Sequence, residues 1–257
     1  MRKGLPDWVR RQLDPLQRYE LRVVLLVLAM VLVVVPFATL LFQVLAEGPI
    51  TRLDSRLAND LNRAVYQRDG VVGFLKVLSY LGGPPMLTVL VVAASGYVLW
   101  RRQPRLAIFL AVTSAGGGIF DSIVKILVDR PRPLVDHAVA TAFGKSFPSG
   151  HAMSSTVVYG ALLVVFLPAL RGRFRRAAVI LTVVVVAAVG SSRLMLGVHF
   201  VSDVIGGYVL GLAWLAGSVA LFETWRVERG QRPSEPLQEG VEPEAGAALR
   251  GEGVGST

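Results

Sequence analysis

The stretch AAVILTVVVVAAVGSSRLML, residues 177–196, decides the fold of this chain. Its single charged side chain, Arg193, lies near one end. At a rise of 1.5 Å per residue, a helix of this length spans about 30 Å, which is the thickness of the hydrocarbon layer of a bilayer. The apolar run is unbroken rather than alternating, which favours a helix over a barrel strand. The sequence therefore predicts a transmembrane helix here.

The rest of the chain repeats this pattern, and 53% of its 257 residues are hydrophobic. Five further apolar runs are long enough to cross a bilayer: 23–46, 71–100, 106–128, 151–170 and 200–224. We therefore expect an all-α bundle of six transmembrane helices over residues 23–225, preceded by an N-terminal segment, residues 1–22. Residues 226–257 are rich in Pro, Gly and Glu and poor in large apolar side chains, so we expect a disordered tail. The absence of cysteine excludes disulfides and cysteine metal sites.

The net charge of +9 is distributed in a way that orients the bundle. Lys and Arg gather in short segments between the apolar runs, which favours a membrane protein over a nucleic-acid partner. Basic residues concentrate in four segments: 1–22, 101–105, 171–176 and 226–232. With six spans these segments share one side, and the positive-inside rule makes that side cytoplasmic. Both termini are then expected in the cytoplasm, and the protein in the cell membrane. The first run exceeds the 7–15 residues of a signal-peptide core, so we interpret it as a retained helix.

The first outer connection, residues 47–70, has a different pattern. Its acidic and basic residues balance, and Leu53, Leu57, Leu61 and Val65 recur at helical spacing. This pattern predicts a short amphipathic helix lying on the membrane, with a plain solvated loop as the alternative.

Three polar clusters lie at the outer ends of the apolar runs, where ionisable groups are costly and usually functional. They are Lys125 with Arg130-Pro131-Arg132-Pro133, then Pro148-Ser149-Gly150-His151, and finally Ser192-Arg193 with His199 and Asp203. Several cations beside the N-terminus of a helix make an anion site, and we expect free N–H groups at residues 149–151. Arg suits phosphate oxygens, and Gly150 lets the backbone approach a ligand closely.

The histidines supply the chemistry for phosphoryl transfer without a metal. His199 and Asp203 are four residues apart, so they share a helical face. A carboxylate on one ring nitrogen leaves the other nitrogen free to attack, and His151 is placed to protonate the leaving oxygen. These residues alone leave the choice of nucleophile between His151 and His199 open, although Asp203 favours His199.

Taken together, Lys125-x6-Arg132-Pro133, Pro148-Ser149-Gly150-His151 and Ser192-Arg193-x5-His199-x3-Asp203 resemble the three-part signature of the type 2 phosphatidic acid phosphatase (PAP2) family. The resemblance implies that His199 forms a phosphohistidine, that Asp203 orients it and that His151 is the acid. It implies that the phosphate is held by Lys125, Arg132, Ser149, Gly150 and Arg193. It also implies that no metal and no cofactor is needed.

Two further residues are left with open roles. Arg130 is either a phosphate contact at the rim or part of a solvated loop. Asp121 either pairs with Lys125, one helical turn away, or makes a separate polar contact in the bundle. The substrate is expected to be a lipid phosphate at the extracytoplasmic face of the cell membrane, with undecaprenyl diphosphate favoured. Phosphatidylglycerophosphate and phosphatidic acid are the enzymatic alternatives, and a catalytically silent protein that binds or transports lipid phosphates is the other class. The sequence leaves the oligomeric state open.

Overall fold

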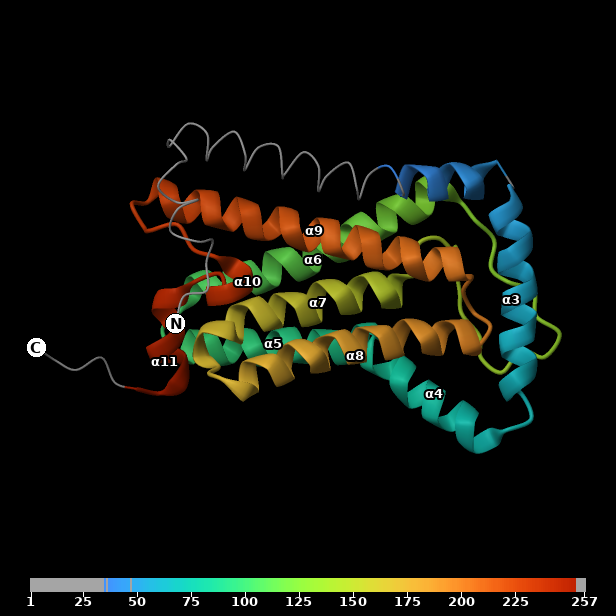
Figure 1. Cartoon of the computed structure of the whole chain (residues 1–257), viewed down its shortest axis with the longest axis horizontal. Helices are drawn as coiled ribbons and strands as arrows, with labels where there is room; N and C mark the ends of the chain where they lie inside the picture. The colour runs from blue at the N-terminus through green and yellow to red at the C-terminus, as the bar shows by residue number, and fades with distance from the viewer. Residues whose placement is uncertain (1–34, 36, 47, 253–257) are drawn as a thin grey trace, which may run out of the picture.

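The computed structural model describes residue 35 and residues 37–46 and 48–252, whose regular elements are all helices, with no strand among them. Most of these helices lie side by side along one axis, with α3 across one end and α10 and α11 at the other (Figure 1). We use "outer end" for the end under α3 and "inner end" for the opposite one, purely as names for the two ends of the structure. The helices are α3 (Pro49–Val65), α4 (Asp69–Leu81), α5 (Pro84–Trp100), α6 (Pro104–Val128), α7 (Gly150–Phe166), α8 (Arg173–Met195), α9 (Val201–Glu228), α10 (Pro236–Glu239) and α11 (Gly246–Arg250), with 3-10 turns η1 (Leu167–Ala169) and η2 (Pro243–Ala245).

Four helical segments in the described part of the chain are long and apolar enough to cross a membrane: α6, α7 with η1, α8 and α9. The pair α4 and α5 makes a fifth span if its two halves count as one. The predicted first span, residues 23–46, lies largely outside the described residues, of which 35 and 37–45 are helical. The structure thus gives an all-helical membrane bundle, while the count of six stays a prediction.

The predicted continuous span over residues 71–100 is instead bent by 42° between α4 and α5. The bend follows from the sequence Gly82-Gly83-Pro84-Pro85. A proline lacks the N–H that a continuing helix needs and its ring collides with the preceding turn, so a new helix begins at Pro84. The apolar composition of the run concealed this break.

Helix α7 is the centre of the bundle and packs against α5, α6, α8 and α9. Its closest partner is α9, which approaches through glycines. A Cβ at Gly211 would lie 2.9 Å from the Met153 carbonyl oxygen, and one at Gly207 would lie 2.7 Å from that of Ser149. Small residues at these positions let the two backbones touch, which brings the N-terminal ends of α7 and α9 together.

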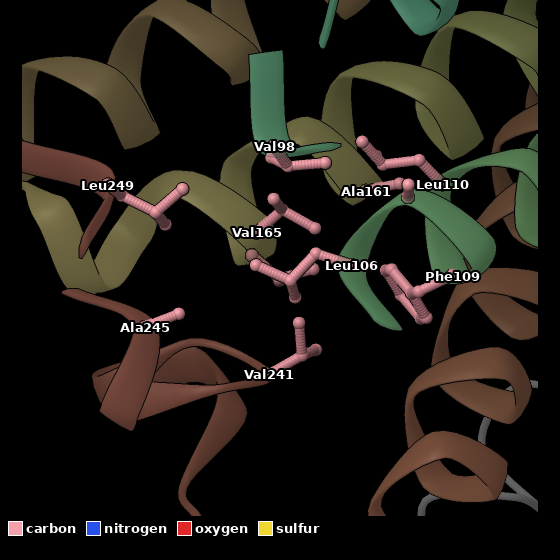
Figure 2. Packing of buried hydrophobic residues seen from close by; sticks show 11 residues of the cluster. Val98, Leu106, Phe109, Leu110, Ala161, Val165, Val241, Ala245 and Leu249 are labelled. Carbon is pink, nitrogen blue, oxygen red and sulfur yellow. The ribbon is translucent and has the colours of Figure 1, made fainter. Parts of the chain in front are cut away.

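The C-terminal tail differs from the expectation of disorder. Residues 236–250 form α10, η2 and α11 against the inner end of the bundle. Figure 2 shows the apolar contact, in which Val241, Ala245 and Leu249 lie buried beside Leu106 and Val165. These three apolar residues, spaced four apart, help to attach a segment whose overall composition suggests disorder, together with the ion pair of Arg226 with Glu244.

Helix α3 confirms the predicted helix between residues 47 and 70 and lies across the outer end of the bundle (Figure 1). The bundle covers its Asp54, Ala58, Asn62 and Val65 face. Leu53 remains exposed on the predicted apolar face. Contact of that face with the membrane stays a prediction, whereas the buried face shares only Val65 with the predicted apolar face.

Candidate active site

The outer end of the bundle brings the three polar clusters together beneath α3. The C-terminal ends of α6 and α8 and the N-terminal ends of α7 and α9 meet there, each carrying part of the sequence pattern. Residues that the sequence singled out and the structure gathers in this place are Lys125, Arg132, Ser149, Gly150, His151, Arg193, His199 and Asp203.

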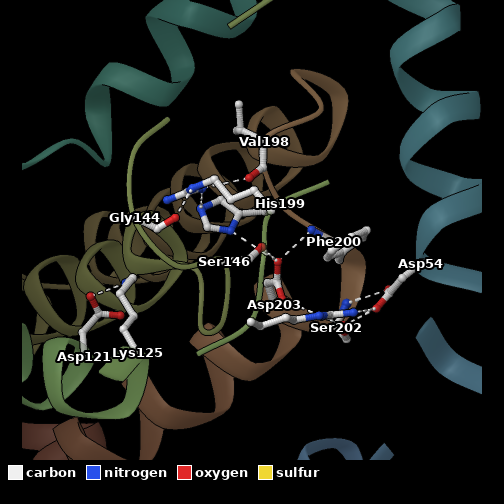
Figure 3. A network of polar contacts seen from close by, with 12 residues as sticks. Asp54, Asp121, Lys125, Gly144, Ser146, Val198, His199, Phe200, Ser202 and Asp203 are labelled. Atoms are coloured by element: carbon white, nitrogen blue, oxygen red, sulfur yellow. Dashed lines mark hydrogen bonds and ion pairs between the residues drawn. The ribbon is translucent and has the colours of Figure 1, made fainter. Parts of the chain in front are cut away.

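His199 and Asp203 are arranged by the first turn of α9. Asp203 accepts a hydrogen bond from the backbone N–H of Phe200 at 2.9 Å, which fixes its carboxylate at the start of the helix. The same oxygen, Oδ2, accepts from the hydroxyl of Ser146 and lies 3.4 Å from Nδ1 of His199 (Figure 3). Both side chains are buried. The carboxylate is therefore held by the backbone and by Ser146 while it faces the imidazole.

Arg132 decides which nitrogen of His199 carries the proton. Its guanidinium lies 3.1 Å from Nε2 of His199 and donates to the backbone carbonyls of Val198, Gly144 and Phe143 at 2.8–3.0 Å. Because Arg can only donate, Nε2 must be the acceptor, and the ring proton lies on Nδ1 towards Asp203. This tautomer leaves a lone pair on Nε2, which is the state that a nucleophilic histidine needs.

The charge on the ring is set by the same surroundings. Burial lowers the pKa of His199 to about 4; Arg132 and Arg193 add to this decrease, and Asp203 opposes it. Desolvation disfavours the cationic form of an imidazole, so the ring is neutral at physiological pH.

The N-terminal end of α7 supplies the next part of the site. The N–H of Ser149 donates to the backbone oxygen of Asp203 at 2.9 Å, so it is not free as the sequence suggested. The hydroxyl of Ser149 is buried without a partner among the described residues. A Cβ on Gly150 would lie 2.8 Å from Nζ of Lys125, so glycine leaves room for the ammonium at the helix end. Lys125 in turn pairs with Asp121, as the four-residue spacing predicts.

Arg193 and His151 complete the site from two other directions. Nη1 of Arg193 donates to the hydroxyl of Ser79 on α4 at 2.6 Å, while its Nε is buried without a partner in the described structure. Nε2 of His151 faces the bend between α4 and α5, where a Cβ on Gly83 would be 3.7 Å away. The break in the second apolar run thus makes room beside His151.

The arrangement suits a phosphate group. Three cationic side chains surround the end of α7, and two buried donors, the Ser149 hydroxyl and Arg193 Nε, lack acceptors among the described residues. Buried donors are almost always satisfied, so donors left open at one place indicate where a ligand binds. An anion with several oxygens would satisfy them and use the dipole of α7.

Comparisons with known proteins identify the family. A sequence profile described as the PAP2 superfamily matches residues 106–226. Phosphatidylglycerophosphatase B of Bacillus subtilis is 32% identical over 138 residues, covering 52% of this chain and 67% of the relative. Decaprenylphosphoryl-5-phosphoribose phosphatase of Mycobacterium tuberculosis is 32% identical over 158 residues, covering 58% of this chain and 78% of that protein. This chain belongs to the PAP2 superfamily.

The fold of the PAP2 chain agrees with this assignment. The crystal structure of a transmembrane PAP2 type phosphatidylglycerolphosphate phosphatase from Bacillus subtilis is similar to it, with a TM-score of 0.63 and 24% sequence identity. The similarity covers 74% of this chain and 96% of the other. At that identity the likeness concerns the fold alone. Together with the apolar helices, family membership makes this protein an integral membrane phosphatase.

Arg130 occupies neither of the places that the sequence left open for it. Its side chain is 7% exposed, and it donates to Asp203 Oδ1 at 2.6 Å and to Asp54 Oδ2 at 2.8 Å. It is therefore neither a rim contact nor a residue of a solvated loop in this PAP2 protein, but a buried cation behind Asp203.

Sequence reasoning missed four polar residues that support the site: Asp54, Ser79, Ser146 and Ser202. All four are buried, and each bonds to a residue of the site or to Arg130. Asp54 lies 76 positions from Arg130 and Ser79 lies 114 from Arg193. A signal for Asp54 did exist, because it shares the helical face of Ala58, Asn62 and Val65, but the more apolar face of α3 obscured it.

Proposed function

We propose that this PAP2 protein hydrolyses a phosphate monoester on a membrane lipid, through a phosphohistidine formed on His199. The observation that carries the proposal is the state of His199, which is buried, neutral and protonated on the nitrogen facing Asp203, with Nε2 directed to Arg132. An arginine that binds phosphate and a free imidazole lone pair at the same point place a nucleophile beside its target.

In the first step, Nε2 of His199 attacks phosphorus as the bond to the leaving oxygen breaks in line. His151, whose protonated form the bound phosphate anion favours, gives its proton to that oxygen, so the lipid leaves as an alcohol. Arg132 gives up its hydrogen bond to Nε2 of His199 and donates to a phosphate oxygen instead. The lone pair on Nε2 is then free to attack. Lys125, Arg193 and the end of α7 stabilise charge on the equatorial oxygens, which is the main catalytic work in phosphoryl transfer.

In the second step, water attacks the phosphohistidine and the bond between nitrogen and phosphorus breaks. His151, now neutral, accepts a proton from that water. Inorganic phosphate leaves, and both histidines return to their starting states. Asp203 stabilises positive charge on the imidazole throughout, as a carboxylate does for a catalytic histidine.

Two observations support a lipid as the substrate. Phe143, whose carbonyl binds Arg132, has a side chain that is 92% exposed, and Leu134 on the same connection is 96% exposed. Exposed apolar residues beside a polar site suit a ligand with a polar head and an apolar tail. The names of the relatives add phosphatidylglycerophosphate and a lipid-linked phosphoribose, so we place phosphate monoesters before undecaprenyl diphosphate, the substrate favoured by the sequence.

A substrate panel tests this function. Purified protein would be given phosphatidylglycerophosphate, phosphatidic acid and undecaprenyl diphosphate, with and without EDTA, and with vanadate as a phosphate analogue. We expect monoester hydrolysis that survives EDTA and is inhibited by vanadate. Preference for the diphosphate would restore the substrate favoured by the sequence. Binding of these lipids without phosphate release would indicate a silent binding or transport protein.

We also propose that the site faces away from the cytoplasm. The arginine-rich segments at residues 101–105, 171–176 and 226–232 are at the end of the bundle opposite the site, and the positive-inside rule makes that end cytoplasmic. Because the natural chain has no cysteine, single-cysteine variants can be labelled uniquely. In intact cells, an impermeant maleimide should label Leu134→Cys and leave Leu237→Cys unlabelled; the reverse pattern would invert the orientation.

A further inference from the structure

Arg130 joins the surface helix α3 to the carboxylate that faces His199. One nitrogen, Nη1, lies 2.6 Å from Asp203 Oδ1 and 2.7 Å from the hydroxyl of Ser202. The other, Nη2, lies 2.8 Å from Asp54 Oδ2, and the guanidinium stacks 4.2 Å above the ring of Phe200. Such a fork has one orientation in which all its partners are satisfied, so it fixes both carboxylates relative to each other.

Asp54 also holds the first turn of α9 directly. Its Oδ1 accepts the backbone N–H of Ser202 at 3.1 Å, and its Oδ2 accepts the hydroxyl of the same residue. The start of α9 is thus capped by a carboxylate from α3 in addition to Asp203 of its own chain segment. Figure 3 shows Asp54 reaching from α3 to Ser202, on the far side of Asp203 from the imidazole.

The charges of this network are unequal. With His199 neutral, the buried groups are one cation, Arg130, and two anions, Asp54 and Asp203, so the network carries one net negative charge. Without Arg130, Asp203 beside the imidazole and Asp54 behind it would lose the cation that they share. A buried negative charge favours the protonated form of histidine, which has no lone pair to attack phosphorus.

We propose that Arg130 and Asp54 are positioning residues of the phosphatase reaction, which hold Asp203 in register with His199 and keep the charge behind the nucleophile low. This inference rests on the function proposed above. Neither residue touches the phosphate site, so both act through Asp203. The pair makes α3 a structural part of the active site rather than a surface connection.

The electrostatic part of the proposal includes the charged groups around His199 and those behind Asp203. Those groups are Asp54 on α3, Lys125 with Asp121 on α6, Arg130 and Arg132 on the connection to α7, His151 on α7, Arg193 on α8 and Asp203 on α9. Only Arg130 and Asp54 are altered below, so the contributions of the other groups stay constant between variants.

The test compares Arg130→Met, Asp54→Asn and the double variant with wild type by kcat over a range of pH. The ratio of variant to wild-type kcat cancels titration of the substrate. Arg130→Met should lose about 100-fold, the upper range for removing a partner that orients a reactive group. The loss should grow as the pH falls, since protonation of His199 then competes more strongly. Asp54→Asn, which keeps the fork on Asp203, should lose about tenfold or less.

The double variant separates charge from orientation. It restores the net charge of the wild-type network while the bond from Arg130 to Asp203 stays absent. We expect its pH dependence to return towards that of wild type, leaving a pH-independent loss from poorer orientation. Titration of the His199 ring by nitrogen NMR, assigned with His199→Ala, should show a higher protonation pH in Arg130→Met than in wild type or the double variant.

Arg226→Met is the matched control, since Arg226 is also buried between carboxylates but lies at the inner end of the bundle. It should show no pH-dependent loss of kcat. The inference is overturned if Arg130→Met and the double variant lose activity equally at every pH, or if Arg130→Met behaves like the control. Activity that survives in His199→Ala would instead overturn the proposed function, so the two failures are distinguishable.

Discussion

The two ends of the bundle use the same device for different purposes. At the outer end, Arg130 binds Asp54 and Asp203; at the inner end, Arg226, which is 0% exposed, binds Glu223 and Glu244. Each arginine ties a helix of the bundle to a segment distant in sequence. The two ends differ in the second partner that each carboxylate contacts.

Asp203 also contacts His199, whereas Glu223 also accepts hydrogen bonds from Ser234 in the C-terminal tail. A buried ion pair is weak evidence for stability, because desolvation offsets most of the attraction. At the outer end the ion pair fixes the orientation of Asp203. At the inner end it helps to attach residues 236–250 to the bundle. The same pairing therefore predicts a catalytic effect in one place and a stability effect in the other.

The largest expected effect comes from the carboxylates themselves. Asp203→Asn should lower kcat about 10³- to 10⁴-fold, because an amide no longer stabilises the imidazole tautomer with a free Nε2. Glu223→Gln makes the same chemical change at the inner end and should alter kcat less than about twofold, as expected for a change far from the site. Phosphate release from a lipid substrate measures both. Equal losses in the two variants would remove the distinction between the ends.

An intermediate effect is expected from the inner arginine. Arg226→Met removes the partner that Glu223 and Glu244 share. Glu223 keeps its bonds from Ser234, Glu244 still lies 3.6 Å from Arg232, and their side chains are 20% and 47% exposed, so water can solvate them. We therefore expect a loss of about 2 kcal/mol, below the 3–5 kcal/mol typical of fully buried pairs. Thermal unfolding in detergent should show a Tm lower by about 6 °C with kcat retained. A large loss of kcat in folded protein would show that the tail takes part in catalysis.

The smallest effect concerns exposed apolar residues at the two ends. Phe143→Ser should raise KM for a long-chain lipid phosphate severalfold and leave a short water-soluble phosphate ester unaffected, since the ring is expected to contact the lipid tail. Leu237, which is 86% exposed, provides the control, because Leu237→Ser removes an apolar side chain remote from the site. An equal change in KM for both esters would assign Phe143 to the phosphate site instead.

The helices and the main polar residues were predictable from sequence because their signals are local. Apolar runs identify α6 to α9, and the four-residue spacing predicts the contact between His199 and Asp203, although His199 lies just before α9 rather than on its face. Asp54 and Arg130 were not predictable in their roles, since nothing local indicates a contact across 76 positions. The tail escaped prediction for a related reason: its three buried apolar residues matter only once the inner end of the bundle offers a surface.

The bend between α4 and α5 shows a different limit. Hydropathy is averaged over a window of residues, so the run from 71 to 100 appears continuous. The local sequence Gly83-Pro84 nevertheless indicates that the helix is interrupted there. Attention to proline chemistry within the run would have found it. The bend also affects the active site, because it lies against His151.

The central claim is that His199 is the nucleophile, and trapping the phosphoenzyme tests it most directly. Protein would be mixed with a lipid carrying a radioactive terminal phosphate and quenched in alkali, which preserves phosphohistidine. Wild type should carry label that acid releases, His151→Ala should retain some label because its deficiency is in proton transfer, and His199→Ala should carry none. Acid-labile label on folded His199→Ala protein would contradict this account.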